Sequence, residues 1–402
     1  MTNQERIQAR IARSKAKRVA KRLTRAEQYG RIDKVITNQH LFRSLMKRRH
    51  GTDWKQSVMD YLFHAIVRNK RQKDAILAGA HPEPGMIREI YLYERGKRRR
   101  VHAVAIDSRV VQGAVCDYCI TPLTQPGLIM DNPASTVGKG VSWTRYRVAK
   151  LIRKGLKEGK NHALVFDLHG FFDSILHSLC ENVFREVHMD EMLISLSMHF
   201  IKMYQVFEAR KFVLEADRES ALARLERNEG VGVSLGSQIS QDMALAAPNR
   251  LDHTIKDRLG EKEYIRYMDD GYIQGTKERL KAVRQTISQV CAEMGFSLHE
   301  TKTRIVKLTR GFPYLKIRYT ALPSTRIIKR MARAGIVRMR RKLKKLHGLI
   351  VAGRATLDDA FNTTKSWLGN AKKYSHSYRS RKAVLNLYHK LFKSYRMEGV
   401  IA

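Results

Sequence analysis

The spacing of apolar residues changes repeatedly along the chain between a helical and an extended pattern, which predicts mixed secondary structure. In the helical stretches apolar residues recur every three or four positions, as Val58, Tyr61, Leu62 and Ala65 do. The predicted helices cover 3–28, 54–78, 107–160 (broken at 121–122 and 132–140), about 174–226, 238–256, 277–295 and 329 onward (broken at 348–353 and near Gly369). Helices therefore account for most of the predicted structure.

Short segments in which polar and apolar residues alternate predict strands between these helices. The strand segments are 87–93 and 100–106, which flank the turn Glu94-Arg-Gly-Lys97, then 163–166, two strands within 264–274 that meet at a tight turn, and further strands within 297–319. A loop is predicted at 230–236, where three glycines fall in seven residues. The pattern as a whole predicts the α+β class.

Aspartates stand where two of the predicted strands end. Asp167 follows the apolar run Leu164-Val-Phe, and Asp269 and Asp270 lie together at the tip of an apolar hairpin. Adjacent carboxylates in such a place are costly unless a cation neutralises them. If the strands lie side by side, Asp167 and Asp269 converge on one spot. Oxygen ligands that leave coordination sites open suit Mg²⁺, and two ions about 4 Å apart activate a hydroxyl and stabilise a leaving pyrophosphate. A strand-end cap is the alternative for Asp167 alone.

The charge of the chain indicates which substrate such a site serves. The 402 residues include 77 Lys and Arg against 38 Asp and Glu, a net charge of +39. The net charge is +22 over residues 1–160, −2 over 161–310 and +17 over 329–397. A near-neutral centre that retains its acids between two basic flanks indicates a nucleic-acid binder that acts on phosphate through metal ions. The alternative is that the flanks are solvated faces.

Composition excludes other classes of protein. Four cysteines form no disulfide framework, which indicates a reducing, cytoplasmic location, and no apolar run reaches the length of a membrane span. Cys116 and Cys119 have a zinc-like spacing but lack a second pair nearby, so we expect no zinc there, and we expect Cys180 and Cys291 to be buried thiols.

The motifs resemble those of a known family. Tyr267-Met-Asp-Asp270, preceded by Phe166-Asp-Leu-His-Gly-Phe-Phe-Asp173, is similar to the palm of reverse transcriptases, and the resemblance runs from about 85 to 380. It implies a right-hand polymerase with fingers, a palm of antiparallel sheet plus helices, and a helical thumb. The implied division is a basic helical extension over 1–80, fingers over 81–160, palm over 161–325 and thumb over 326–402.

The resemblance also implies the catalytic and metal-binding residues. Asp167, Asp269, Asp270 and the backbone carbonyl of Leu168 would hold two Mg²⁺ ions, with Mn²⁺ as the alternative ion. Lys302, within Leu298-His-Glu-Thr-Lys302, matches the lysine that protonates the leaving pyrophosphate, in keeping with general acid catalysis.

A further set of residues would bind the incoming deoxynucleotide in the family. These residues are Arg99 and Arg109 for the triphosphate, Phe172 as the aromatic gate against a 2′-hydroxyl, Gln238 and Gln241 in Gly236-Ser-Gln-Ile-Ser-Gln241, and Met268. The planar guanidinium of arginine suits phosphate in its own right. The alternatives are ordinary surface arginines, a core aromatic at Phe172 (as expected for Phe171) and a helix-capping loop before Gln238.

Two more segments resemble family elements, and one motif narrows the lineage. Residues 312–319 are similar to the primer-grip hairpin, and 366–374 are similar to thumb helices that follow the duplex by its shape. The Gly236–Gln241 motif resembles the Gly-x-x-x-Ser-Gln form of diversity-generating retroelement enzymes rather than the Pro-Gln-Gly form of intron and retroviral ones.

Three biological settings remain open. The first is a diversity-generating system with an accessory protein, and the second is antiphage defence with a noncoding RNA. The third is a catalytically silent RNA-binding scaffold or splicing cofactor. The partners expected in the first two settings are a structured RNA template, the cDNA product and dNTPs, with an accessory protein or a second copy of the chain and no membrane.

Overall fold

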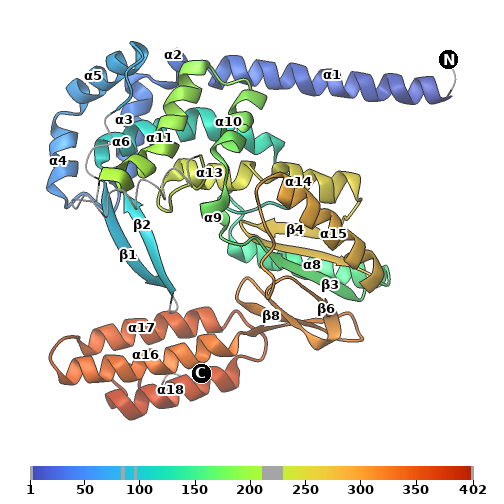
Figure 1. Cartoon of the computed structure of the whole chain (residues 1–402). Coiled ribbons are helices and arrows are strands. Elements are labelled where there is room, and N and C mark those ends of the chain that lie inside the picture. The colour runs from blue at the N-terminus through green and yellow to red at the C-terminus, as the bar shows by residue number, and fades with distance from the viewer. Residues whose placement is uncertain (1–2, 83–86, 95–96, 211–229, 400–402) are drawn as a thin grey trace. The chain divides into compact units, whose positions relative to one another are not determined.

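The computed structural model describes residues 3–82, 87–94, 97–210 and 230–399 (Figure 1). The chain forms two compact units, and each is discontinuous in sequence. The first unit comprises Met1–Val137, Leu168–Gly260 and Thr286–Leu298. The second unit comprises Gly138–Asp167, Glu261–Gln285 and His299–Ala402.

The first unit consists of helices and one hairpin. Its helical segments are α1 (Asn3–Tyr29), α2 (Ile32–Val35), α3 (Asn38–Arg49), α4 (Gln56–Phe63), α5 (Ala65–Leu77), α6 (Ile106–Val115), the π-helix η1 (Cys116–Ile120), α7 (Thr121–Thr124), the 3₁₀-helix η2 (Gln125–Gly127), α9 (Phe171–Ser174), α10 (His177–Glu186), α11 (Glu191–Arg210), α13 (Gln238–Ala246), α14 (Asn249–His253) and the π-helix η3 (Thr254–Arg258). The hairpin pairs β1 (Arg88–Glu94) with β2 (Lys97–Ala103) in antiparallel register, as its alternation predicts.

Helix α6 lies at the core of the first unit. Val110, Val111, Ala114 and Val115 are fully buried, and α3 packs against α6 through its own buried leucines. The Ser44 hydroxyl donates to the carbonyl oxygen of Val110 at 2.6 Å, which ties the two helices together. Because Thr37 accepts a hydrogen bond from the backbone N–H of His40, α3 begins at a defined residue.

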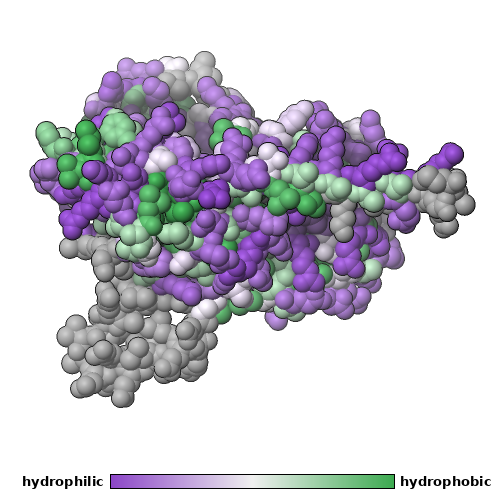
Figure 2. All heavy atoms as spheres, turned by 90° about the horizontal axis from the view of Figure 1, so that it is seen from above, coloured by the Kyte–Doolittle hydropathy of each residue, from purple (hydrophilic) through white to green (hydrophobic). Residues whose placement is uncertain are grey.

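Helix α1 is basic and mostly exposed, as its composition predicts. A row of apolar side chains nevertheless follows one face of it, seen as pale to full green spheres in Figure 2. This row consists of Ala12, Ala16, Val19, Ala20 and Leu23, at the three- and four-residue intervals of one helical face. The helix is therefore amphipathic as well as basic.

The second unit is built on an antiparallel sheet in the order β4-β5-β3-β6. Its strands are β3 (His162–Asp167), β4 (Tyr264–Tyr267), β5 (Asp270–Gly275) and β6 (Arg304–Lys307). Helix α8 (Val141–Lys157) packs against β4 and β5, and α15 (Lys277–Glu293) follows β5, the division between the units falling within it. Residues 163–166 of β3 are buried, as an apolar run predicts, and Ala163 and Val165 lie in one apolar cluster with residues of α8.

A second, three-stranded antiparallel sheet shares the core of that unit. It contains β7 (Phe312–Tyr314), β8 (Ile317–Ala321) and β9 (Ile327–Met331), with the 3₁₀-helix η4 (Leu308–Arg310) before it. The rings of Tyr272 and Phe312 stack with centroids 5.5 Å apart, and Phe312 stacks on Tyr319 at 5.7 Å. These aromatic contacts join the two sheets through one apolar cluster.

Three helices end the described chain and pack around a core of their own. They are α16 (Arg333–Val351), α17 (Leu357–Ala371) and α18 (Tyr378–Phe392), which lie side by side in Figure 1. Leu343, Val384 and Tyr388 are fully buried among them. Thr356 and Asp359 form a capping box that begins α17.

Most predicted elements are confirmed, and several bounds are wrong. Residues 327–331 form a strand where a helix was predicted from 329, because pairing with β8 buries Ile327 in the sheet core. The predicted helix breaks at 348–353 and near Gly369 are confirmed, because α16 ends at Val351 and α17 ends at Ala371, although Gly348 and Gly369 themselves lie in the last turns of these helices. The predicted helix over 238–256 is interrupted at Pro248. The part of the 174–226 prediction beyond Arg210 lies outside the described residues.

Two further bounds differ from the prediction. Strand β2 ends at Ala103, and α6 begins at Ile106, so the predicted strand over 100–106 is too long by three residues. The predicted helix over 54–78 is two helices with His64 between them.

Over the described residues, no helix combines the length and the apolar character that crossing a membrane requires.

Candidate active site

The central sheet of the second unit gathers the three aspartates at one end. Strands β3 and β5 are antiparallel neighbours, and Asp167 pairs directly with Asp270 in their register. Asp269 precedes Asp270 in the turn between β4 and β5. The predicted hairpin is therefore confirmed, and its second strand, β5, pairs with β3, so that carboxylates more than 100 residues apart in sequence become neighbours.

The turn that carries Asp269 is held in an unusual backbone conformation. Met268 has a φ of +56°, in the left-handed region that non-glycine residues rarely adopt. The buried Arg266 guanidinium donates to the Met268 carbonyl oxygen at 2.9 Å. Backbone strain of this kind persists where the surroundings impose it and concentrates at functional sites. The buried Arg266 guanidinium therefore stabilises the conformation of this turn.

The electrostatics of the aspartate cluster favour the binding of positive charge. Burial, and then the charges of Asp269 and Asp167, raise the pKa of Asp270 to about 7. The Lys302 ammonium donates to both carboxylate oxygens of Asp167, at 2.7 and 2.9 Å, and is itself about half exposed. The contact of the Lys302 ammonium with Asp167 and the raised pKa of Asp270 are both typical of a site that binds cations.

The donor set fits Mg²⁺ as part of a larger coordination shell. Oxygen donors of Asp167, Asp269 and Asp270 are the hard ligands that this ion prefers, and it retains several water and phosphate oxygens. Among the described residues, no group of three or more His, Cys, Asp or Glu side chains is placed so that it could hold a metal ion by itself.

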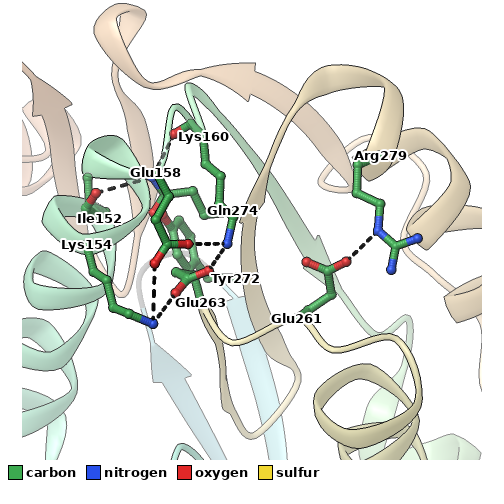
Figure 3. A network of polar contacts seen from close by, with 9 residues as sticks. All are labelled: Ile152, Lys154, Glu158, Lys160, Glu261, Glu263, Tyr272, Gln274 and Arg279. Atoms are coloured by element: carbon green, nitrogen blue, oxygen red, sulfur yellow. Dashed lines mark hydrogen bonds and ion pairs between the residues drawn. The ribbon is translucent and has the colours of Figure 1, made fainter.

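The opposite end of the same strands is closed by a polar network (Figure 3). The fully buried Glu263 carboxylate accepts from Lys154 at 2.7 Å and from Lys160. The Gln274 side-chain amide donates to the carbonyl oxygens of Ile152 and Lys160, at 3.2 and 2.8 Å. These bonds attach the end of α8 and the start of β3 to β5, so the network holds the strands that present the aspartates.

Apart from Met268, which lies in the second unit, the residues predicted to bind the nucleotide belong to the first unit, as does Leu168. The Leu168 backbone pairs with Leu298 in an isolated antiparallel bridge. Arg99 is exposed on β2, and Gln241 is exposed in the first turn of α13. Phe172 is half-buried beside Phe171, with ring centroids 5.6 Å apart in an edge-on arrangement.

Arg109 and Gln238 are brought together by a residue that the sequence analysis missed. Arg109 donates to the backbone carbonyl oxygen of Arg48 at 2.8 Å, and the Arg48 guanidinium donates to the Gln238 side-chain oxygen. Burial, and then the charge of Arg48, lower the pKa of Arg109. Arg48 belongs to the basic run 47–49, which reads as a solvated face. Its helical spacing from Leu41 and Ser44 was the signal that could have found it.

The glycine-containing loop before α13 lies against the hairpin. Gly236 has a φ of +106°, and a Cβ there would lie 2.8 Å from the carbonyl oxygen of His102. The His102 backbone N–H donates to the Leu235 carbonyl oxygen at 3.1 Å, and its ring lies 2.6 Å from the Ser234 hydroxyl. The backbone of this loop therefore approaches strand β2 closely, at a position where glycine leaves the space.

Two lesser predictions about buried side chains are confirmed. Phe171 is buried and contacts Phe296, as expected for a core aromatic. Cys180 and Cys291 are buried thiols that form no disulfide, and burial raises the pKa of Cys180 to about 12. Cys116 and Cys119 are buried in the π-helical segment η1, where burial raises the pKa of both thiols.

Comparison with known proteins agrees with this geometry. A family model described as reverse transcriptase (RNA-dependent DNA polymerase) matches residues 86–320, more than half of the chain. The search of curated proteins gave no match. The matched residues include all three aspartates, Lys302 and the Gly236–Gln241 motif, whereas α1 to α5 precede them.

Proposed function

The chain belongs to the reverse transcriptase family and is an RNA-directed DNA polymerase, and we propose that Asp167, Asp269 and Asp270 are its catalytic metal ligands. The direct pairing of Asp167 with Asp270, with Asp269 beside them, is the observation that carries the proposal. Two bound Mg²⁺ ions would make the primer 3′-hydroxyl nucleophilic and neutralise the leaving pyrophosphate. Mn²⁺ is the alternative ion, and the Leu168 carbonyl is a further proposed ligand.

The protein groups around the aspartates have distinct proposed roles. Asp167 holds the Lys302 ammonium within hydrogen-bond distance, and this ammonium is the proposed proton donor to the leaving pyrophosphate. Asp270, whose pKa lies near 7, ionises fully when positive charge enters the site. Met268 and the Arg266-supported turn keep Asp269 in place. The protein thus contributes mainly positioning and electrostatic stabilisation.

The nucleotide-binding residues are proposed from the family motif. Arg99 and Arg109 would hold the triphosphate, and the half-buried ring of Phe172 would close the space beneath the sugar. Gln238 and Gln241 stand on the first turn of α13, next to the loop that β2 contacts. A planar guanidinium can bind two phosphate oxygens at once, which supports the arginine assignments.

The basic flanks are proposed to hold a structured RNA template and the cDNA. Helix α16 exposes a dense row of cations, namely Arg338, Arg340, Arg341, Lys342, Lys344 and Lys345. Helix α1 carries a comparable charge at the other end of the chain. Binding that depends on such contacts releases counterions, so RNA affinity should fall steeply with salt.

For the biological setting we propose a diversity-generating retroelement-like system in the cytoplasm. The Gly236–Gln241 motif favours it. Antiphage defence with a noncoding RNA is the second candidate. Adenine-biased errors in cDNA sequenced from the purified protein and its native RNA would support diversification, whereas repetitive or protein-linked cDNA would support defence.

The catalytic proposal is tested by removing the charges at the tip of the hairpin. The double variant Asp269→Asn, Asp270→Asn should lose DNA synthesis on a primed RNA template and keep its RNA affinity within about twofold, since the flanks supply the phosphate contacts. Synthesis that persists in this variant would refute the metal-ligand assignment. A wild-type chain that binds RNA and makes no cDNA with any divalent ion would instead favour the scaffold.

A further inference from the structure

Arg48 lies outside the residues that match the family, yet its side chain reaches a motif inside them. It is on α3, one turn beyond Ser44 and Leu45, which pack against α6. Its side chain is only 11% exposed, unlike that of its neighbour Lys47, which is 66% exposed. A buried guanidinium needs partners for its donors, because an unpaired buried charge is strongly destabilising.

Those partners form a closed ring of three side chains. The Arg48 guanidinium donates to an Asp117 carboxylate oxygen at 3.1 Å and to the Gln238 side-chain oxygen. The Gln238 side-chain amide donates in turn to the other Asp117 oxygen, at 2.8 Å. Burial raises the pKa of Asp117, but its bonds from Gln238 and the charge of Arg48 lower that pKa by more. The ring therefore contains an ionised carboxylate and holds Gln238 in one orientation.

The fold leaves room for this guanidinium. At Gly113, in the middle of α6, an added Cβ would lie 1.7 Å from the Nε of Arg48 and 1.9 Å from its Cζ. No backbone atom is among the three nearest to that position. The glycine thus provides the space that the Arg48 side chain occupies. The backbone carbonyl oxygen of Arg48 also accepts a hydrogen bond from Arg109, which is proposed to bind the triphosphate of the nucleotide.

We infer that Arg48 is a positioning residue for nucleotide binding, acting through the orientation of Gln238. The inference rests on the proposed function, because it takes Gln238 as a residue that contacts the nucleotide or its template base. It gives the region before the matched residues a role beyond holding RNA: helix α3 completes the site. Lysine cannot replace arginine fully there, since a single ammonium lacks the fork that reaches Asp117 and Gln238 together.

The test compares dNTP kinetics on a primed RNA template for four single variants. Arg48→Met removes the fork, Arg48→Lys keeps the charge, and Gly113→Ala displaces the guanidinium without changing it. Arg43→Met removes an exposed charge from the same helix and is the control. Alanine also favours a helix over glycine, so Gly113→Ala should not loosen α6 by itself.

For Arg48→Met and Gly113→Ala we expect the KM for dNTP to rise about tenfold or more, the loss that follows from a charged hydrogen bond. The kcat should change less, and RNA affinity should stay within twofold of wild type. Arg48→Lys should fall between these variants and wild type, and Arg43→Met should keep the wild-type KM for dNTP. An Arg48→Met protein with fewer active molecules but an unchanged KM for dNTP would show a merely structural role and overturn the inference.

A double variant distinguishes the failure of this inference from the failure of the proposal that Gln238 contacts the nucleotide or its template base. If Arg48 acts through Gln238, adding Arg48→Met to Gln238→Met should cost little more than Gln238→Met alone. Two full and independent losses would overturn the positioning role while leaving the nucleotide role of Gln238 intact. A Gln238→Met enzyme with wild-type kcat/KM would refute the role of Gln238 itself, and with it the route by which Arg48 acts.

Discussion

The Glu263 network offers the sharpest test of how the catalytic sheet is held. Glu263 has a fully buried side chain, whereas Lys154 and Lys160 are 51% and 25% exposed. Replacing both lysines with methionine leaves a buried carboxylate without its two cations. Replacing Glu263 with glutamine leaves two ammonium groups that can turn toward water. Both perturbations remove the ion pairs of Glu263, and the lysine replacements also remove the exposed pairs with Glu158. They should differ in their effects on stability because only the lysine replacements leave a buried charge.

The burial of each partner sets the magnitude. Breaking a buried pair so that one charge remains unpaired costs about 3–5 kcal/mol, so we expect a loss in this range for Lys154→Met with Lys160→Met. Glu263→Gln should cost about 1–2 kcal/mol, because only hydrogen bonds and partly exposed ion pairs are lost. Adding Glu263→Gln to the double lysine variant removes the unpaired charge and should restore about 2 kcal/mol.

The assay is urea unfolding followed by circular dichroism, with Lys157→Met as the control for loss of an exposed lysine on the same helix. The control should stay within about 0.5 kcal/mol of wild type. If Glu263→Gln makes the double lysine variant less stable still, the carboxylate does not depend on these two cations and the reasoning fails.

The same network predicts that the stabilities of the wild type and of the double lysine variant depend on pH in opposite directions. In wild type, burial raises the pKa of Glu263, but the bonds from Lys154 and Lys160 lower it by more, so the net shift is downward. That contribution to stability is complete above the unfolded pKa of about 4.3 and is lost as the pH falls through the folded pKa. Without the lysines burial alone remains, the pKa rises, and stability should instead decline as the pH rises above about 4.3. Identical pH profiles of unfolding would contradict this account.

Three further predictions concern the catalytic residues and their support. Phe172→Val should open the space beneath the sugar and reduce discrimination against ribonucleotides by about tenfold or more in competitive incorporation, and unchanged discrimination would assign the ring to the core. Gly271→Ala would place a Cβ 2.1 Å from the ring of Phe166, so it should destabilise the protein by about 1–3 kcal/mol in urea unfolding; wild-type stability would mean that the ring can move. Lys302→Met should lower kcat by about 10²-fold with RNA affinity unchanged, and single-turnover kinetics that show no loss would exclude Lys302, despite its contact with Asp167, as the proton donor.

Local sequence patterns predicted an element correctly where residues within the element itself determine its structure. The strand before Asp167 is apolar over 163–166 because side chains on both of its faces are buried, and the hairpin at 264–274 combines apolar strands with a polar turn. Predictions failed where a partner far away in sequence decides the outcome. Strand β9 forms because it pairs with β8 and buries Ile327 in the core of that sheet.

The sequence by itself determined the chemistry available to this protein: three aspartates at strand ends, a basic chain and the motifs of the reverse transcriptase family. Those features are readable because charge, residue type and short-range spacing are local properties. Only the tertiary structure decided that Asp167 pairs with Asp270, that Lys302 neutralises Asp167, and that Arg48 reaches Gln238 from a helix before the matched residues. These contacts join residues more than 100 positions apart, and no local pattern encodes them, because they depend on how whole elements pack.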